Sequence, residues 1–246
     1  MKRILLLPIL FFIALFKYSG VEAQDVADYQ FEASIEAYQE ITGGTVITNS
    51  NNANDVFYAN NNIGFDFVFG GQTFNQIGVS TNGFASFSIG NGVTFPLEEG
   101  LENSLSPFSG DLIAQNNSEI RIQTLGSVPN RRTVIQWKNY DYNFTWGEDQ
   151  VDDANYNFQL ILFENNNAIS FHYGNIVHPN SYTYFLFGFI PITRNTDREI
   201  QVSLNSNITS FQNRTGANNN WNTNNTSNST NRNATLRLEN DLVPTN

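Results

Sequence analysis

Hydrophobic and polar positions alternate most clearly within residues 63–87, and this alternation predicts β-strands. Because successive side chains of a strand point to opposite faces, apolar residues at every second position share one face of a sheet. Gly70-Gly71 interrupts the pattern, and Asn82-Gly83 predicts a tight hairpin turn with both residues at positive φ. The segment therefore predicts three short strands of a scaffold and no catalytic chemistry. Its apolar residues are Phe65, Phe67 and Phe69, then Ile77 and Val79, then Phe84 and Phe87.

Similar patterns predict strands along most of the remaining chain. A half-buried first strand is expected at residues 29–38, with Gly43-Gly44 as the turn after it. Residues 184–190 are apolar on both faces, which predicts a central strand, and 199–204 is expected to be the last strand. A loop is expected at 90–110, and further strands at 119–124, 132–137, 156–163 and 168–173, the last two forming a hairpin across residues 165–167.

The number and spacing of these strands predict an all-β fold. About ten strands, joined by Asn- and Gly-rich turns and without a helix of useful length, favour an antiparallel β-sandwich that is jelly-roll-like. We expect residues 24–204 to form this β-sandwich domain. Residues 205–246 form an Asn/Ser/Thr-rich tail or linker, in which Leu236, Leu238 and Leu242 allow one strand to return to the sheet.

Residues 1–23 have the pattern of a secretory signal peptide. Lys2 and Arg3 precede an apolar run at 4–16, and a small-residue cleavage site ends at Ala23. The run is shorter than the roughly 20 residues that a membrane-spanning helix needs, so membrane insertion is not expected. We therefore expect a secreted protein, extracellular or at the outer cell surface, with the periplasm as the alternative.

Charge and cysteine content exclude several classes of partner. The 246-residue chain has a net charge of −11 and no cysteine, so no disulfide supports the fold. Removal of the signal peptide leaves 9 basic and 22 acidic residues, a net charge of −13. Nucleic acid and anionic lipid both require a cationic patch, so neither is expected as a partner.

Several segments, in this order, carry a family resemblance: Gly43-Gly44-Thr45, IGFDFVFGG from residue 63, VSTNGF from 79, PFSGDL from 107, VIQWKNY from 134 and FQLILFENNNAISFHYGNI from 158. Over most of residues 28–215 the chain resembles the amino-terminal β-sandwich module of Bacteroidetes secreted and cell-surface proteins. It is also distantly similar to the nidogen-type extracellular domain. In the resembling family this module often precedes fibronectin-type repeats and a sorting domain, so we expect a stand-alone member or part of a longer product.

An aromatic ladder after the predicted strand at 132–137 is the strongest indication of a binding site. Tyr140, Tyr142, Phe144 and Trp146 alternate with polar residues, so in an extended segment their rings share one face. Exposed rings of this kind bind the apolar faces of sugars. The alternative is that the rings fill the sandwich interior. The apolar phase changes from odd to even positions after Trp137, which predicts a bulge or loop there.

An acidic cluster follows the aromatic ladder: Glu148, Asp149, Asp152 and Asp153. A hard cation such as Ca²⁺ would relieve the repulsion between these carboxylates, because it takes six to eight oxygen ligands. The alternative is a solvated acidic turn, since the spacing matches no defined calcium loop. The sequence therefore predicts no certain cofactor and calcium as the candidate metal.

The histidines do not indicate catalysis. His172 is expected to be a solvent-facing or hydrogen-bonded strand residue and His178 a loop residue, and two histidines without cysteine do not favour a zinc site. Asp111 falls at the acidic position of the resembling family's Pro-Phe-Trp-Asp-like motif, and Ser109 stands where that motif often has an aromatic residue. We interpret Asp111 as a turn cap.

These observations favour a secreted, non-catalytic surface or adhesion module that binds extracellular polysaccharide. The first alternative is a structural spacer or assembly domain that binds only surface proteins. The second is a calcium-dependent hydrolase or an accessory domain of one. No catalytic residue is assigned, and exposure of Tyr142 and Trp146 would distinguish the glycan-binding hypothesis from the structural one.

Overall fold

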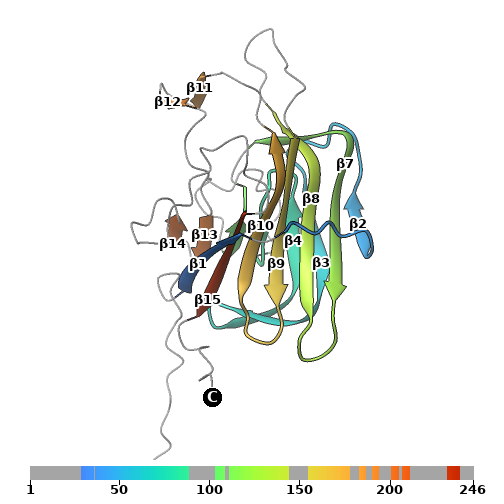
Figure 1. Cartoon of the computed structure of the whole chain (residues 1–246), viewed down its shortest axis with the longest axis vertical. Helices are drawn as coiled ribbons and strands as arrows, with labels where there is room; N and C mark the ends of the chain where they lie inside the picture. The colour runs from blue at the N-terminus through green and yellow to red at the C-terminus, as the bar shows by residue number, and fades with distance from the viewer. Residues whose placement is uncertain are drawn as a thin grey trace, which may run out of the picture.

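The computed structural model describes residues 29–35, 37–88, 103–108, 111–143 and 155–177, and the strands at 183–186, 190–193, 201–204, 207–210 and 232–238. These parts of the chain contain fifteen strands and no helix. All strand pairs between them are antiparallel. Two sheets lie face to face (Figure 1), so the expected antiparallel β-sandwich is confirmed.

Sheet A has seven described strands, and β15, the last strand that the structure describes, lies inside it. β15 pairs with β1 on one side and with β10 on the other, so the beginning and the end of the sandwich are neighbours. The Asn-rich region thus returns one strand, and residues 24–204 do not hold all of sheet A. In spatial order the sheet contains β1 (Tyr29–Ile35), β15 (Arg232–Leu238), β10 (Ile169–Val177), β9 (Asn155–Phe163), β8 (Arg132–Tyr142), β7 (Leu112–Leu125) and β2 (Thr45–Thr48).

Sheet B has six strands: β14 (Asn207–Ser210), β13 (Gln201–Leu204), β6 (Ser104–Ser106), β5 (Ala85–Ser86), β4 (Gln72–Ser80) and β3 (Phe57–Phe69). Its composition corrects two predictions, because 199–204 is not the last strand and the expected loop at 90–110 contains β6. A third prediction is also wrong. Residues 184–190 do not form one central strand, since β11 (Thr183–Leu186) and β12 (Ile190–Thr193) pair with each other in a separate two-stranded sheet.

The two predicted glycine turns differ in their outcome. Gly70 and Gly71 both have positive φ (58° and 74°) and join β3 to β4, as the sequence predicts. At the second turn only Gly83 has positive φ (76°), and the prediction for Asn82 is wrong. A Cβ atom at Gly83 would lie 2.5 Å from the carbonyl oxygen of Phe108, so this turn requires glycine for space as well as for conformation.

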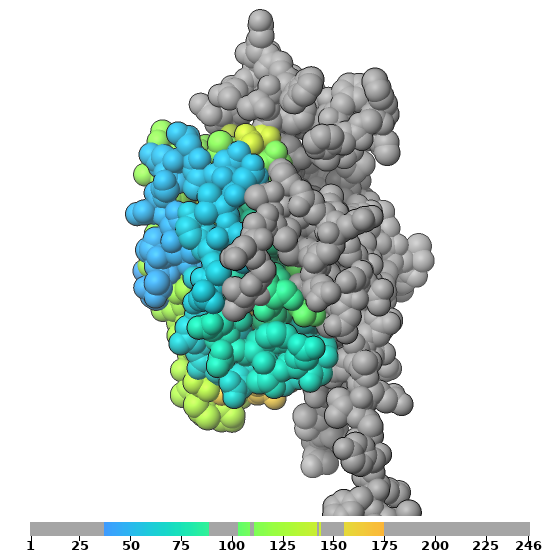
Figure 2. Space-filling model, turned by 180° about the vertical axis from the view of Figure 1, so that it is seen from behind, coloured from blue at the N-terminus to red at the C-terminus, as the bar shows by residue number. Residues whose placement is uncertain are grey.

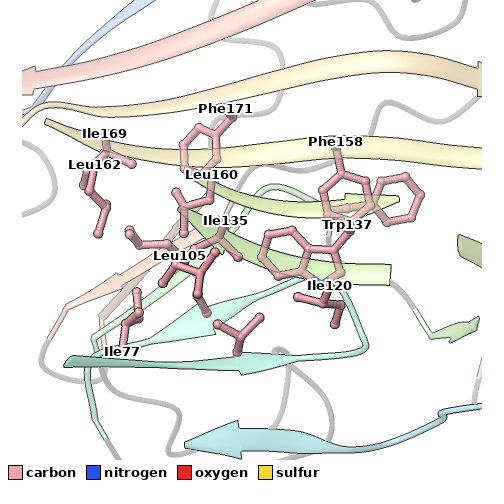
Figure 3. Close-up of a cluster of buried hydrophobic side chains, with 14 of the residues drawn as sticks. Ile77, Leu105, Ile120, Ile135, Trp137, Phe158, Leu160, Leu162, Ile169 and Phe171 are labelled. Atoms are coloured by element: carbon pink, nitrogen blue, oxygen red, sulfur yellow. The ribbon is translucent and has the colours of Figure 1, made fainter. Parts of the chain in front are cut away.

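The core lies between the sheets and consists mainly of aromatic and branched side chains (Figure 3). Trp137 of β8 is fully buried, and its ring stacks on Phe158 of β9 with 5.0 Å between centroids. The indole Nε1 also donates a hydrogen bond of 2.8 Å to the carbonyl oxygen of Ser80 in sheet B. One side chain therefore both fills the core and ties the two sheets together.

Residues 37–44 form a strap that crosses the outer face of sheet A between β1 and β2 (Figure 1). Buried glutamines hold its backbone: Gln136 accepts a hydrogen bond from the Ile41 amide at 2.9 Å, and Gln159 donates one to the Gln39 carbonyl at 2.7 Å. Arg121 Nη1 donates to two further strap carbonyls, at 3.1 and 3.2 Å. The strap thus supplies hydrogen-bond partners to a row of polar side chains across β7, β8 and β9.

Candidate functional site

The aromatic ladder begins inside the core and not on the surface. Tyr140 is fully buried, so its ring is not available to a ligand and the exposed platform cannot include it. The reason is a β-bulge: the pairing of β8 with β9 shifts between Trp137 and Tyr140, and Asn139 has positive φ (58°). The extra residue returns Tyr140 to the face that Trp137 occupies, which confirms the bulge predicted from the change of apolar phase.

The Tyr140 hydroxyl is an unusual buried group. It has no hydrogen-bond partner among the described residues, and burial raises the pKa of the phenol far above its ordinary value, with a smaller contribution from Tyr58. The phenol therefore stays neutral throughout the physiological range. Its ring contributes to packing, as the interior alternative for the ladder predicts.

The rest of the predicted site lies at or beyond the end of β8. Tyr142 is the last residue of that strand, and its backbone pairs with Leu112 of β7. The side chain of Tyr142 lies outside the described residues, as do Phe144 and Trp146 and the acidic cluster of Glu148, Asp149, Asp152 and Asp153. Within the described part of the chain, no group of three His, Cys, Asp or Glu residues could hold a metal ion.

Four polar residues from separate segments meet where β8 ends, and we call them the polar junction: Asp55, Asn82, Asp111 and Asn143. Asn82 is fully buried, accepts a hydrogen bond from the Leu112 amide at 3.0 Å and donates one to Asp55 Oδ1 at 2.9 Å. Asn143 donates to Asp111 twice, from its amide to the backbone oxygen at 2.8 Å and from Nδ2 to Oδ1 at 3.3 Å. The junction therefore fixes the residue from which the aromatic and acidic segment continues.

Burial determines the electrostatics of the polar junction. Desolvation raises the pKa of Asp111 above its ordinary value, the hydrogen bond from Asn143 opposes this rise, and the charge of Asp55 adds to it. Asp111 thus holds Asn143 beside it, and its interpretation as a turn cap stays a prediction. Sequence reasoning missed Asn82 as the link, although its motif VSTNGF and the motif PFSGDL, which carries Leu112, were both visible in the sequence.

The histidine that the structure describes is part of sheet A. His172 is half-buried on β10, and its Nε2 lies 2.9 Å from Ser170 Oγ. Ser170 is only 1% exposed, so its hydroxyl has no open path to a substrate. This arrangement confirms the expected hydrogen-bonded strand residue, while His178 lies outside the described residues.

The described part of the chain is an antiparallel β-sandwich module. Its buried polar side chains mostly form hydrogen bonds that hold loops and sheets in place. In the described part of the chain, no helix has the length and apolar character needed to cross a membrane. The chain belongs to the NIDO-related family, whose family model matches residues 28–241. Comparisons with curated proteins and with solved structures gave no match. The family match confirms the nidogen-type similarity and extends through β15.

Proposed function

We propose that the chain is a non-catalytic extracellular module that binds glycan through the segment following β8. The observation that carries this proposal is the double hydrogen bond between Asn143 and Asp111, which anchors the start of that segment at one end of the sandwich. Membership of the NIDO-related family supports the extracellular and non-catalytic parts of the proposal.

The proposed ligand contacts come from the residues just beyond the anchor. With Tyr140 in the core, the aromatic residues left for a sugar are Tyr142, Phe144 and Trp146, whose rings can stack on its apolar face. The carboxylates of Glu148, Asp149, Asp152 and Asp153 supply the oxygen ligands that Ca²⁺ prefers, and bound calcium would order the same segment. Binding is therefore expected to increase when calcium is added.

Glycan-array binding by the mature chain, residues 24–246, tests this proposal. The protein must extend through β15, because that strand lies between β1 and β10 in sheet A. Trp146→Ala is expected to abolish binding while near-ultraviolet circular dichroism shows an intact fold. Trp221→Ala, in the Asn-rich region, is the matched control and should bind like the wild type.

The same assay separates the proposal from its alternatives. A folded wild-type protein that binds no glycan, with or without calcium, would refute glycan recognition and favour a structural or protein-binding role. Equal loss of binding in both tryptophan variants would move the ligand away from the segment after β8. Release of reducing sugar from a bound glycan would contradict the non-catalytic assignment.

A further inference from the structure

The outer edge of sheet A is formed by β2, a short strand with no described neighbour beyond it. β2 pairs with β7 on one side, with a β-bulge between Val46 and Thr48, and its other side lies at the free margin of the molecule in both views (Figures 1 and 2). All four of its residues, Thr45, Val46, Ile47 and Thr48, are β-branched. An exposed strand edge of this kind offers unpaired backbone N–H and C=O groups to another strand.

The edge of sheet B on the same side of the sandwich is closed. Thr124 Oγ1 donates to the Ile63 carbonyl of β3 at 2.9 Å, and Arg131 Nη1 donates to the Gly64 carbonyl at 2.7 Å. The Val68 amide donates to Asn167 Oδ1 at 2.8 Å. Residues of sheet A therefore occupy backbone groups of β3 between Ile63 and Val68, whereas no such contact to the outer side of β2 is found among the described residues.

The exposure of apolar side chains also favours β2 as a contact edge. Val46 is 39% exposed and Val128 is 69% exposed, and these two are the large hydrophobic side chains exposed in the described part of the chain. Val128 lies in the turn between β7 and β8. Val46 lies on the edge strand, while the next residue, Ile47, packs against the core. Among the side chains that the structure describes, Val46 is therefore the exposed large apolar residue on an edge strand.

Charge favours a second copy of this chain as the occupant of the edge. Residues 41–54 contain no charged side chain, although the whole chain has a net charge of −11. Two copies that meet at β2 thus bring no like charges into direct contact, and a neutral edge gives no electrostatic attraction for a basic or an acidic partner. The neutral, β-branched edge is suited to contact with itself.

We propose that the protein forms a symmetric dimer by antiparallel pairing of β2 with β2 of a second copy. A two-fold axis perpendicular to the joined sheet leaves the outer faces of both copies on the same side of that sheet. Residues that lie opposite each other across the contact must therefore point their side chains to the same face. An axis through any one residue meets this condition, and we centre it on Val46, the exposed apolar residue before the bulge, which places Val46 opposite its own copy. The pairing joins two seven-stranded sheets into one continuous sheet.

Sedimentation equilibrium on the mature chain tests this dimer, from about 10 μM to about 1 mM, because a contact of this size is expected to be weak. The wild type should dimerise within that range, and higher salt should strengthen the dimer by screening the net negative charge. Val46→Lys places two ammonium groups opposite each other and should weaken dimerisation by about tenfold or more. Val128→Lys adds the same charge at the other exposed valine and should dimerise as tightly as the wild type.

Hydrogen exchange locates the contact independently of the mutations. Amides of Thr45–Thr48 should become more protected as the wild-type concentration rises, and those of the Val46→Lys variant should not. A wild type that remains monomeric to about 1 mM would overturn the proposal. Equal behaviour of the two lysine variants, or concentration-dependent protection at a different segment, would overturn it as well. The dimer stands or falls separately from glycan binding, because neither lysine variant touches the segment after β8.

Discussion

Trp137→Phe is expected to destabilise the sandwich strongly, because Trp137 is both a core side chain and a hydrogen-bond link between the sheets. The indole is fully buried, stacks on Phe158 and donates from Nε1 to the Ser80 carbonyl at 2.8 Å. Phenylalanine keeps an aromatic ring in place and removes only the outer part of the indole. The substitution therefore measures the link more than the loss of aromatic packing.

The magnitude follows from two contributions. Loss of about 40 Å³ of buried side chain costs about 1 kcal/mol at about 24 cal/mol per Å³. Removal of a buried hydrogen-bond donor costs about 1–2 kcal/mol, towards the lower end because the Ser80 carbonyl still accepts a long bond of 3.4 Å from the Gly83 amide. The expected loss is about 2–3 kcal/mol, which lowers Tm by roughly 4–12 °C for a chain of this size.

Urea unfolding followed by circular dichroism at 25 °C measures this loss, together with a thermal scan. The control is Val128→Ala, at a side chain 69% exposed, which should change the free energy of unfolding by less than about 0.5 kcal/mol. A loss below about 1 kcal/mol for Trp137→Phe, with an unchanged denaturant slope, would refute the idea that this side chain links the sheets.

Three further substitutions test the strap, an ion pair and the polar junction. Gly174→Ala places a Cβ atom 2.8 Å from the Tyr38 ring, so the amides of the strap should exchange faster; unchanged exchange would show that Tyr38 does not hold the strap to β10. The ion pair and hydrogen bonds to Arg131 lower the pKa of Glu164 below 4.5, so the pair stabilises the fold at higher pH and this contribution disappears as the pH falls through the lowered value. Urea unfolding should therefore show Glu164→Gln less stable than the wild type at pH 7 and equal to it at low pH, and a pH-independent difference would contradict the assignment. Burial raises the pKa of Asp111 above 3.8, so its charged form destabilises the fold at neutral pH; Asp111→Asn should be more stable than the wild type at pH 7, and this gain should shrink as the pH falls below the raised value. A variant that is less stable at pH 7 would show that the junction needs the charge.

The sequence alone determined the fold class and many of the strands, because alternation with a period of two is a local property. The Phe65, Phe67 and Phe69 pattern and the Gly70-Gly71 turn correspond to β3 and its hairpin to β4. The phase change after Trp137 predicted the bulge that directs Tyr140 into the core. Each of these features depends on residues within a few positions of one another, so no knowledge of distant contacts was needed.

The tertiary structure decided which strands are neighbours and which polar groups are used inside the fold. Nothing local in Asn82 shows that its side-chain oxygen accepts a hydrogen bond from the backbone amide of Leu112, thirty residues later, and the Asn-Gly pair instead suggested a hairpin with two left-handed residues. Residues 184–190 are apolar on both faces, yet the described ones belong to β11 and β12, which pair with each other in a separate sheet, and the local pattern does not show which strands pair. Burial of Tyr140, the place of β15 inside sheet A and the open edge at β2 all follow from packing between distant segments. Such packing is a property of the assembled sheets, and a pattern of hydrophobic and polar positions does not encode it.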